Sequence, residues 1–182
     1  MNIFAIVGSA STPSSNLHLV RYVSGLLEPH CTVTIFDRLK ELPHFDPQLS
    51  VSETPQPVLD FREAIAQADG VLFCTPEYVF SIPSGLKNAL EWCVSTTIFS
   101  QKPVGIITAS AHGVQGHEEL QRILRTIYAQ VYTPATLLIQ GIKGKVSETG
   151  SITDQATIEK LTAFAEAFAG FVQKESRIQT GV

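Results

Sequence analysis

The sequence predicts an α/β protein built on a doubly wound parallel sheet of five strands, with helices on both faces in a three-layer arrangement. Short apolar or β-branched runs alternate with stretches in which apolar residues recur every three or four positions, along nearly all of the 182 residues. In addition, three of the apolar runs lead through a loop rich in Ser, Pro or Gly into a helix. Right-handed crossovers between such strands favour the strand order 2-1-3-4-5.

The first half of the chain supplies three strands and two helices. The apolar run Ile3–Val7 predicts the first strand, and a helix with apolar residues on one face begins near Asn16. The β-branched run Thr32–Phe36 predicts the second strand, because branched side chains fit a pleated surface. Helical spacing returns in Val58–Ala68, and Gly70–Thr75 predicts a third, buried strand.

The second half continues the same alternation. Ser84–Val94 is predicted as a helix, and Pro103–Thr108 as the fourth strand, with proline at a first position where a missing N–H is tolerated. Helical spacing covers Glu118–Val131, and Ala135–Ile139 predicts the fifth strand.

The last helix has the clearest pattern. Phenylalanine and other apolar residues recur at three or four positions after Asp154, which is predicted as the N-cap. The Gly- and Ser-rich stretch Gln140–Ser151 before it predicts a surface loop. No domain linker interrupts the alternation, so we expect residues 1–182 to form a single domain.

The composition favours a globular protein without a nucleic-acid partner. Hydrophobic residues make up 44% of the chain and charged residues 16%. The formal net charge is −4 and the 13 Lys and Arg residues are scattered, whereas nucleic acids are bound by basic patches. No apolar segment approaches the roughly 20 residues that span a bilayer, so no membrane association is expected.

Cysteine usage and the amino terminus favour a cytoplasmic protein. The 3 cysteines, an odd number without a C-x-x-C pair, argue against a disulfide framework and a zinc ribbon. The amino-terminal apolar run is short and has no basic segment before it, which favours a first strand over a signal peptide. We therefore expect a reducing, cytoplasmic setting.

The first loop, Gly8–Asn16, leads directly into a helix and is rich in hydroxyl and amide side chains. These belong to Ser9, Ser11, Ser14, Ser15 and Asn16. Free N–H groups and the positive end of the helix dipole favour an anion there, and a phosphate is expected. The alternative is that Ser14, Ser15 or Asn16 only caps the helix. The spacing fits neither a Walker A loop nor G-x-G-x-x-G, which favours the phosphate of a mononucleotide.

The second loop, Pro76–Pro83, is stiffened by proline at both ends. Tyr78 offers a flat ring and a hydroxyl, and backbone amides between Glu77 and Phe80 are suited to the polar edge of a flat ligand. Glu77 is a candidate general base, but we favour the interpretation that this loop carboxylate is solvated or structurally paired. Tyr78 and Phe80 are also candidate interface residues, since exposed aromatic rings often mark contacts.

The third loop, Ser110–Gly116, contains glycines that let the backbone approach a ligand closely. His112 and His117 have no third ligand nearby, so no metal site is expected. His112 stays a candidate for lining a pocket or donating a proton. A nucleophile elbow requires G-x-S-x-G, and Ser110 has Thr108 and His112 at the glycine positions, which excludes that interpretation.

Sequence motifs in all three loops resemble those of a known family. Gly8, Ser9, Ser14 and Asn16 match its pattern G-S-x-R-x-x-S-x-N. Pro76, Glu77, Tyr78, Ser81, Pro83, Leu86, Lys87, Asn88, Ala89, Glu91 and Trp92 match P-E-Y-N-x-S-x-P-x-x-L-K-N-A-x-[DE]-W. Ser110, Gly113 and Gly116 match a glycine-rich loop. On these residues the chain resembles the NAD(P)H-dependent FMN reductase family, which has a flavodoxin-like fold and includes quinone, azo-dye and chromate reductases.

The resemblance implies that FMN binds with its phosphate in the first loop and its isoalloxazine ring between the second and third loops. The implied cofactor-binding residues are Ser9, Ser11, Ser14, Ser15, Asn16, Pro76, Glu77, Tyr78, Val79, Ser81, Ser110, His112, Gly113 and Gly116. The resemblance also implies NADPH or NADH as the electron donor and free flavin or a quinone as the acceptor. The implied assembly is a homodimer or a tetramer. No catalytic residue is named, because bound flavin carries the chemistry.

Two positions depart from the family pattern. Ser11 stands where the family has arginine, and the loss of a charge-assisted hydrogen bond, worth ~1.5–3 kcal/mol, predicts weaker FMN binding or a changed preference for NADPH. Val79 stands where the family has asparagine, which alters the flavin contact if the side chain makes it. Two alternatives stay open: an FMN-binding electron carrier that does not use NAD(P)H, and a binding module that has lost its flavin.

Overall fold

The computed structural model describes residues 1–9, 11, 14–28 and 31–180, with the backbone alone for residues 179 and 180. Its strands are β1 (Asn2–Val7), β2 (Thr32–Phe36), β3 (Gly70–Thr75), β4 (Pro103–Ser110) and β5 (Gln130–Gln140). They form one parallel sheet in the order β2-β1-β3-β4-β5, which confirms the predicted topology. Every residue of β3 is buried, as its continuous apolar run predicts.

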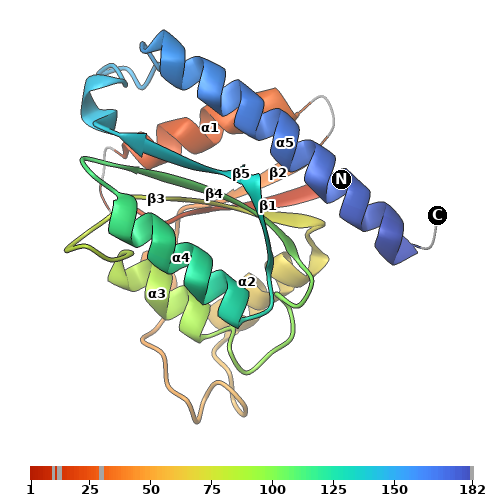
Figure 1. The fold of residues 1–182 in the computed structure, drawn as a ribbon. Coiled ribbons are helices and arrows are strands. Elements are labelled where there is room, and N and C mark those ends of the chain that lie inside the picture. The colour runs from red at the N-terminus through yellow and green to blue at the C-terminus, as the bar shows by residue number, and fades with distance from the viewer. Residues whose placement is uncertain (10, 12–13, 29–30, 181–182) are drawn as a thin grey trace.

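Helices cover both faces of the sheet and give the molecule three layers (Figure 1). They are α1 (Ser15–Leu27), α2 (Gln56–Gln67), α3 (Ser84–Glu91), α4 (Val114–Thr126) and α5 (Gln155–Thr180), with the short 3-10 turns η1 (Leu39–Glu41) and η2 (Ile142–Gly144). α1 and α5 pack on one face, and α2, α3 and α4 on the other. Within the described residues, no helix is both long and apolar enough to cross a membrane.

Side-chain caps fix the starts of α1 and α5. The Ser14 hydroxyl accepts a hydrogen bond of 3.3 Å from the backbone N–H of Leu17. Asp154, the predicted cap, accepts one of 2.9 Å from the N–H of Thr157. Each cap of this kind stabilises its helix by about 1 kcal/mol, because it satisfies an N–H that has no partner within the helix.

α4 lies nearer the amino terminus than predicted. It begins at Val114 rather than Glu118 and ends at Thr126 rather than Val131. Gly113 has a φ of 89°, a left-handed conformation that glycine adopts without a steric penalty. This residue turns the chain from β4 straight into the helix, so the third loop is shorter than the sequence suggests.

β5 is correspondingly longer than predicted. It begins at Gln130 rather than Ala135, and Val131 pairs with Val104 of β4 instead of ending a helix. The register shifts just after this pair, and Pro134 falls in the shifted segment. Proline is tolerated there because β5 is an edge strand, where a missing N–H removes no ladder hydrogen bond on the open side.

Candidate functional site

A cavity of about 540 Å³ lies at the carboxyl ends of the strands. It is lined by Ser9, Ser11, Ser15, Asn16, Pro76, Glu77, Tyr78, Ala109, Ser110, Ala111, Gly141, Ile142, Lys143 and Gly144. All three predicted loops therefore contribute to one cavity, because the carboxyl ends of parallel strands share an edge of the sheet. Its volume falls in the range of small-molecule sites.

The first loop divides into cavity-lining and structural residues. The hydroxyls of Ser9 and Ser11 lie 2.8 Å apart, and both residues line the cavity together with Ser15. Ser14 does not line it and instead caps α1, so the capping interpretation holds for this residue.

Asn16 ties the first loop to the centre of the sheet. Its side chain is buried, and its amide nitrogen donates to the carbonyl of Ala109 over 3.4 Å. Its amide oxygen accepts a contact of 3.4 Å from the thiol of Cys74. Burial raises the pKa of this thiol, so Cys74 stays protonated and donates. Asn16 is thus held at the base of the cavity by β3 and β4.

Glu77 is structurally paired, as the sequence interpretation favours. Its carboxylate accepts hydrogen bonds from the backbone N–H groups of Gly113 and Gly116, at 3.1 and 2.8 Å. Its carbonyl accepts a further bond of 3.3 Å from the hydroxyl of Ser110. The carboxylate therefore caps the positive end of α4 and joins the second loop to the third.

A tight turn at the tip of the second loop carries backbone strain. Tyr78 and Ser81 exchange backbone hydrogen bonds of 2.9 and 3.0 Å. Between them, Val79 and Phe80 have φ values of 50° and 57° and are 94% and 74% exposed. The turn is held from α4, because the carboxylate of Glu119 accepts bonds from the Ser81 hydroxyl and the Ile82 N–H.

Val79 is the more strained of the two turn residues, since a β-branched side chain fits the left-handed region poorly. Replacing Val79 by asparagine, which tolerates this region, should raise the free energy of unfolding by about 1 kcal/mol. The Tm should rise by about 2–4 °C, measured by thermal unfolding followed by circular dichroism. Val51→Asn is the matched control, because Val51 is 81% exposed and is not among the positive-φ residues. An equal rise in Tm in both variants would contradict the inference that backbone strain at Val79 lowers the stability.

The remaining residues predicted in the second and third loops lie outside the cavity lining. They are Val79, Ser81, His112, Gly113 and Gly116. His112 is exposed, whereas Gly116 lies within α4. A Cβ on Gly116 would lie 3.3 Å from the side chain of Glu77. Glycine at this position therefore makes room for the Glu77 cap.

His117 is half-buried and hydrogen-bonded within the fold. Its Nδ1 lies 2.8 Å from the hydroxyl of Thr108, and burial lowers the pKa of the imidazole. No group of three His, Cys, Asp or Glu side chains in the described ranges is arranged to hold a metal ion.

The sequence interpretation missed one wall of the cavity. Residues 141–144, expected in a surface loop, form a turn against the third loop, with the Gly141 N–H donating to the Ala111 carbonyl over 3.2 Å. A Cβ on Gly141 or Gly144 would meet open space, so both glycines present bare backbone. The two glycines flanking Ile142 and Lys143 were the available sequence signal.

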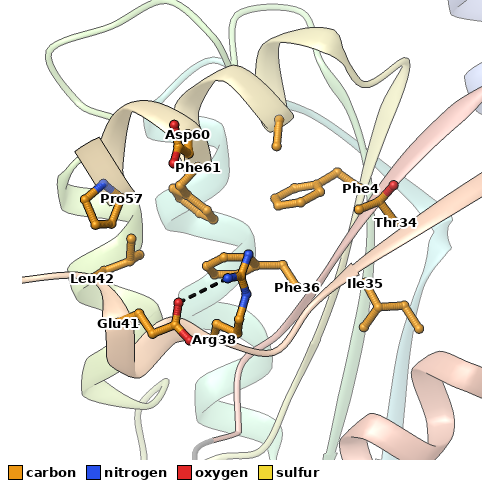
Figure 2. Close-up of a pocket in the computed structure, with 11 residues that line it drawn as sticks. Phe4, Thr34, Ile35, Phe36, Arg38, Glu41, Leu42, Pro57, Asp60 and Phe61 are labelled. Carbon is orange, nitrogen blue, oxygen red and sulfur yellow. Dashed lines mark hydrogen bonds and ion pairs between the residues drawn. The ribbon is translucent and has the colours of Figure 1, made fainter. Parts of the chain in front are cut away.

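A second hollow, about 260 Å³, lies at the free edge of β2 (Figure 2). The rings of Phe4, Phe36 and Phe61 pack against one another there, with centroids 5.0–5.9 Å apart. Arg38 lies over the Phe36 ring and pairs with Glu41 at 3.2 Å. None of the three loops reaches this hollow, so we treat it as part of the packing between β2 and α2.

The sheet order and the two helical layers are those of a flavodoxin-like α/β fold, and the cavity lies at the carboxyl ends of its strands. The family model for NADPH-dependent FMN reductase matches residues 1–143. The chain therefore belongs to the NADPH-dependent FMN reductase family, and it is an oxidoreductase of that family.

Individual relatives agree with this assignment along nearly the whole chain. A quinone reductase of Escherichia coli (strain K12) is 32% identical, with 96% of each chain covered. An NADH-dependent flavin reductase subunit 2 of Lactobacillus johnsonii is 29% identical, covering 97% of this chain and 100% of the relative. The structure of the flavoenzyme NAD(P)H:(acceptor) oxidoreductase FerB from Paracoccus denitrificans matches with a TM-score of 0.80 and 26% identity, covering 96% and 98%.

Proposed function

We propose that this protein uses NADPH or NADH to reduce FMN held in the cavity, and that a quinone or free flavin is the final acceptor. The observation that carries the proposal is the single cavity formed where all three loops meet. The names of the Escherichia coli and Lactobacillus johnsonii relatives support the two acceptor classes. For a quinone, the overall reaction moves two electrons and two protons, from NAD(P)H and one proton, to give NAD(P)⁺ and the hydroquinone.

The residues present fit FMN. The hydroxyls of Ser9, Ser11 and Ser15 at the amino terminus of α1 suit its phosphate. Tyr78 and the backbone beside Ser110 suit the ring, and the bare backbone of Gly141 leaves room for it. When bound, FMN supplies the two-electron redox chemistry. The protein holds and orients FMN, and the hydrogen bonds of the Glu77 carboxylate keep the second and third loops aligned with each other.

The first test is to add FMN to the purified protein and record the visible spectrum before and after anaerobic NADPH or NADH. We expect a perturbed flavin spectrum on binding, rapid bleaching by at least one donor, and recovery of the colour when a quinone is added. Binding without bleaching by either donor would overturn the reductase proposal. Bleaching without recovery would overturn the choice of quinone.

Ser9→Ala should weaken FMN binding at least about tenfold, because a hydrogen bond to a charged group contributes ~1.5–3 kcal/mol. Riboflavin, which lacks the phosphate, should bind both proteins alike. Titration of flavin fluorescence measures both affinities. Ser100→Ala is the control, since Ser100 is exposed and does not line the cavity. An unchanged FMN affinity in Ser9→Ala would overturn the assignment of the phosphate to the first loop.

We also propose that the chain is a single cytoplasmic domain that assembles as a homodimer. Val79 and Phe80 support the assembly, because they expose apolar surface beside the cavity. The free, buried cysteines Cys31, Cys74 and Cys93 suit a reducing compartment. Light scattering should give twice the chain mass of 19.8 kDa. A mass of one chain would overturn the homodimer, and a mass of four chains would indicate the tetramer instead.

A further inference from the structure

We propose that Lys143 supplies the positive charge for a nucleotide phosphate in the cavity, a role that the first loop leaves open. That loop contains no lysine or arginine, and the family arginine is Ser11 here. Among the described lining residues, Lys143 is the one basic side chain. The carboxylate of Glu77 is the one acidic group there, and two backbone N–H groups already neutralise it in part.

The backbone on both sides of Lys143 is fixed at the rim of the cavity. The N–H of Gly141 donates to the carbonyl of Ala111, which anchors the turn to the third loop. Ile142 is 4% exposed and packs into the core beneath α1 and α5. The Gly144 N–H then closes the turn onto the Gly141 carbonyl at 3.1 Å. The position of the lysine is therefore set by the fold.

The side chain of Lys143, in contrast, has no competing partner in the part of the chain that the structure describes. It is exposed, and it makes none of the hydrogen bonds or ion pairs there. Lys145, two positions on, lies 4.0 Å from the carboxylate of Asp154 and does not line the cavity. Among the described contacts, Lys145 is thus paired away from the cavity, whereas Lys143 has no partner at the cavity rim.

The chemistry of the site selects a phosphate as the ligand group. An ammonium on a four-carbon stem binds phosphate as a mobile point charge. The serine hydroxyls and the α1 amino terminus in the same cavity supply neutral donors but no full charge. The phosphate belongs either to FMN or to the nicotinamide dinucleotide, and this part of the inference rests on the proposed function.

The test compares Lys143→Gln with the matched control Lys145→Gln. Flavin fluorescence titrations measure FMN and riboflavin affinities, and titrations of the FMN-loaded protein with NADP⁺ and NAD⁺ measure donor-site affinities. We expect Lys143→Gln to weaken a phosphate-dependent affinity by about three- to tenfold, with riboflavin unchanged. The difference should shrink as salt is raised, because the lysine is exposed. Lys145→Gln should bind as the wild type does.

The outcomes separate the two phosphate sources and the two proposals. A loss confined to FMN assigns Lys143 to the flavin phosphate, whereas a loss confined to the dinucleotides assigns it to theirs. Three results would overturn the role of Lys143. Lys143→Gln could lose as much affinity for riboflavin as for FMN, it could behave like Lys145→Gln, or it could bind every ligand with unchanged affinity. If wild-type protein binds FMN and Lys143→Gln binds every ligand equally well, this inference alone fails. If the wild-type protein binds neither FMN nor a nicotinamide dinucleotide, both the role of Lys143 and the proposed function fail.

Discussion

Replacing Glu77 by alanine should lower the free energy of unfolding by about 2–3 kcal/mol and the Tm by about 5–10 °C. The carboxylate accepts the N–H groups of Gly113 and Gly116, and no other acceptor in the described contacts serves them. Two fully buried bonds to a charged group would contribute ~3–6 kcal/mol, and because Glu77 is only half-buried, solvent reduces the expected loss to about 2–3 kcal/mol. Urea unfolding followed by circular dichroism measures the loss.

The same substitution should weaken FMN binding, because the cap aligns the second and third loops on either side of the cavity. Glu77→Gln keeps one acceptor oxygen and should fall between the alanine variant and the wild type. Glu148→Ala is the control, since Glu148 is exposed and lies outside the cavity lining. A Glu77→Ala protein that unfolds and binds FMN like the wild type would contradict the capping role. If Glu77→Ala kept its stability and its FMN affinity but no longer oxidised NAD(P)H, Glu77 would instead be identified as a residue that takes part in the reaction.

The location of the cavity was predictable from the sequence because it depends on topology. Once parallel strands are recognised, the loops after β1, β3 and β4 must meet at one edge of the sheet. Ser9, Tyr78 and Ser110 were found in this way, and all three line the cavity. The partner of Glu77 was not predictable, because its acceptor role depends on N–H groups that lie 36 and 39 positions further along the chain.

The errors in the predicted bounds of α4 and β5 have a common physical cause. Val131 continues the helical spacing of Leu120 and Leu124, so local periodicity assigns it to the helix. In the folded chain its backbone pairs with Val104, and strand pairing outweighs the local pattern. The wall at residues 141–144 was missed for a related reason, since its place against Ala111 follows from where β5 ends.

Trp92 is a core residue, and the structure shows why its loss should be costly. The indole is fully buried at the end of α3. Its N–H donates to the carbonyl of Pro43 over 2.8 Å, and its ring packs edge-on against Phe45 with centroids 5.3 Å apart. The Trp92 carbonyl accepts a bond of 2.8 Å from the guanidinium of Arg62. Trp92 therefore holds the segment after η1 against α2 and α3.

Trp92→Ala should lower the free energy of unfolding by about 3–5 kcal/mol, since the indole leaves a cavity that its neighbours fill only in part. Trp92→Phe keeps one aromatic ring for Phe45 but loses the N–H donor and the second ring of the indole, at a smaller cost of about 1–2 kcal/mol. The Pro43 carbonyl retains a bond of 3.0 Å from the Asn88 amide, which limits that cost.

Because the chain has 1 Trp, which both variants lack, urea unfolding must be followed by circular dichroism rather than by intrinsic fluorescence. Equal losses in the two variants would show that the hydrogen bond, rather than ring packing, holds the segment. FMN affinity should be unchanged in Trp92→Phe, because Trp92 does not line the cavity.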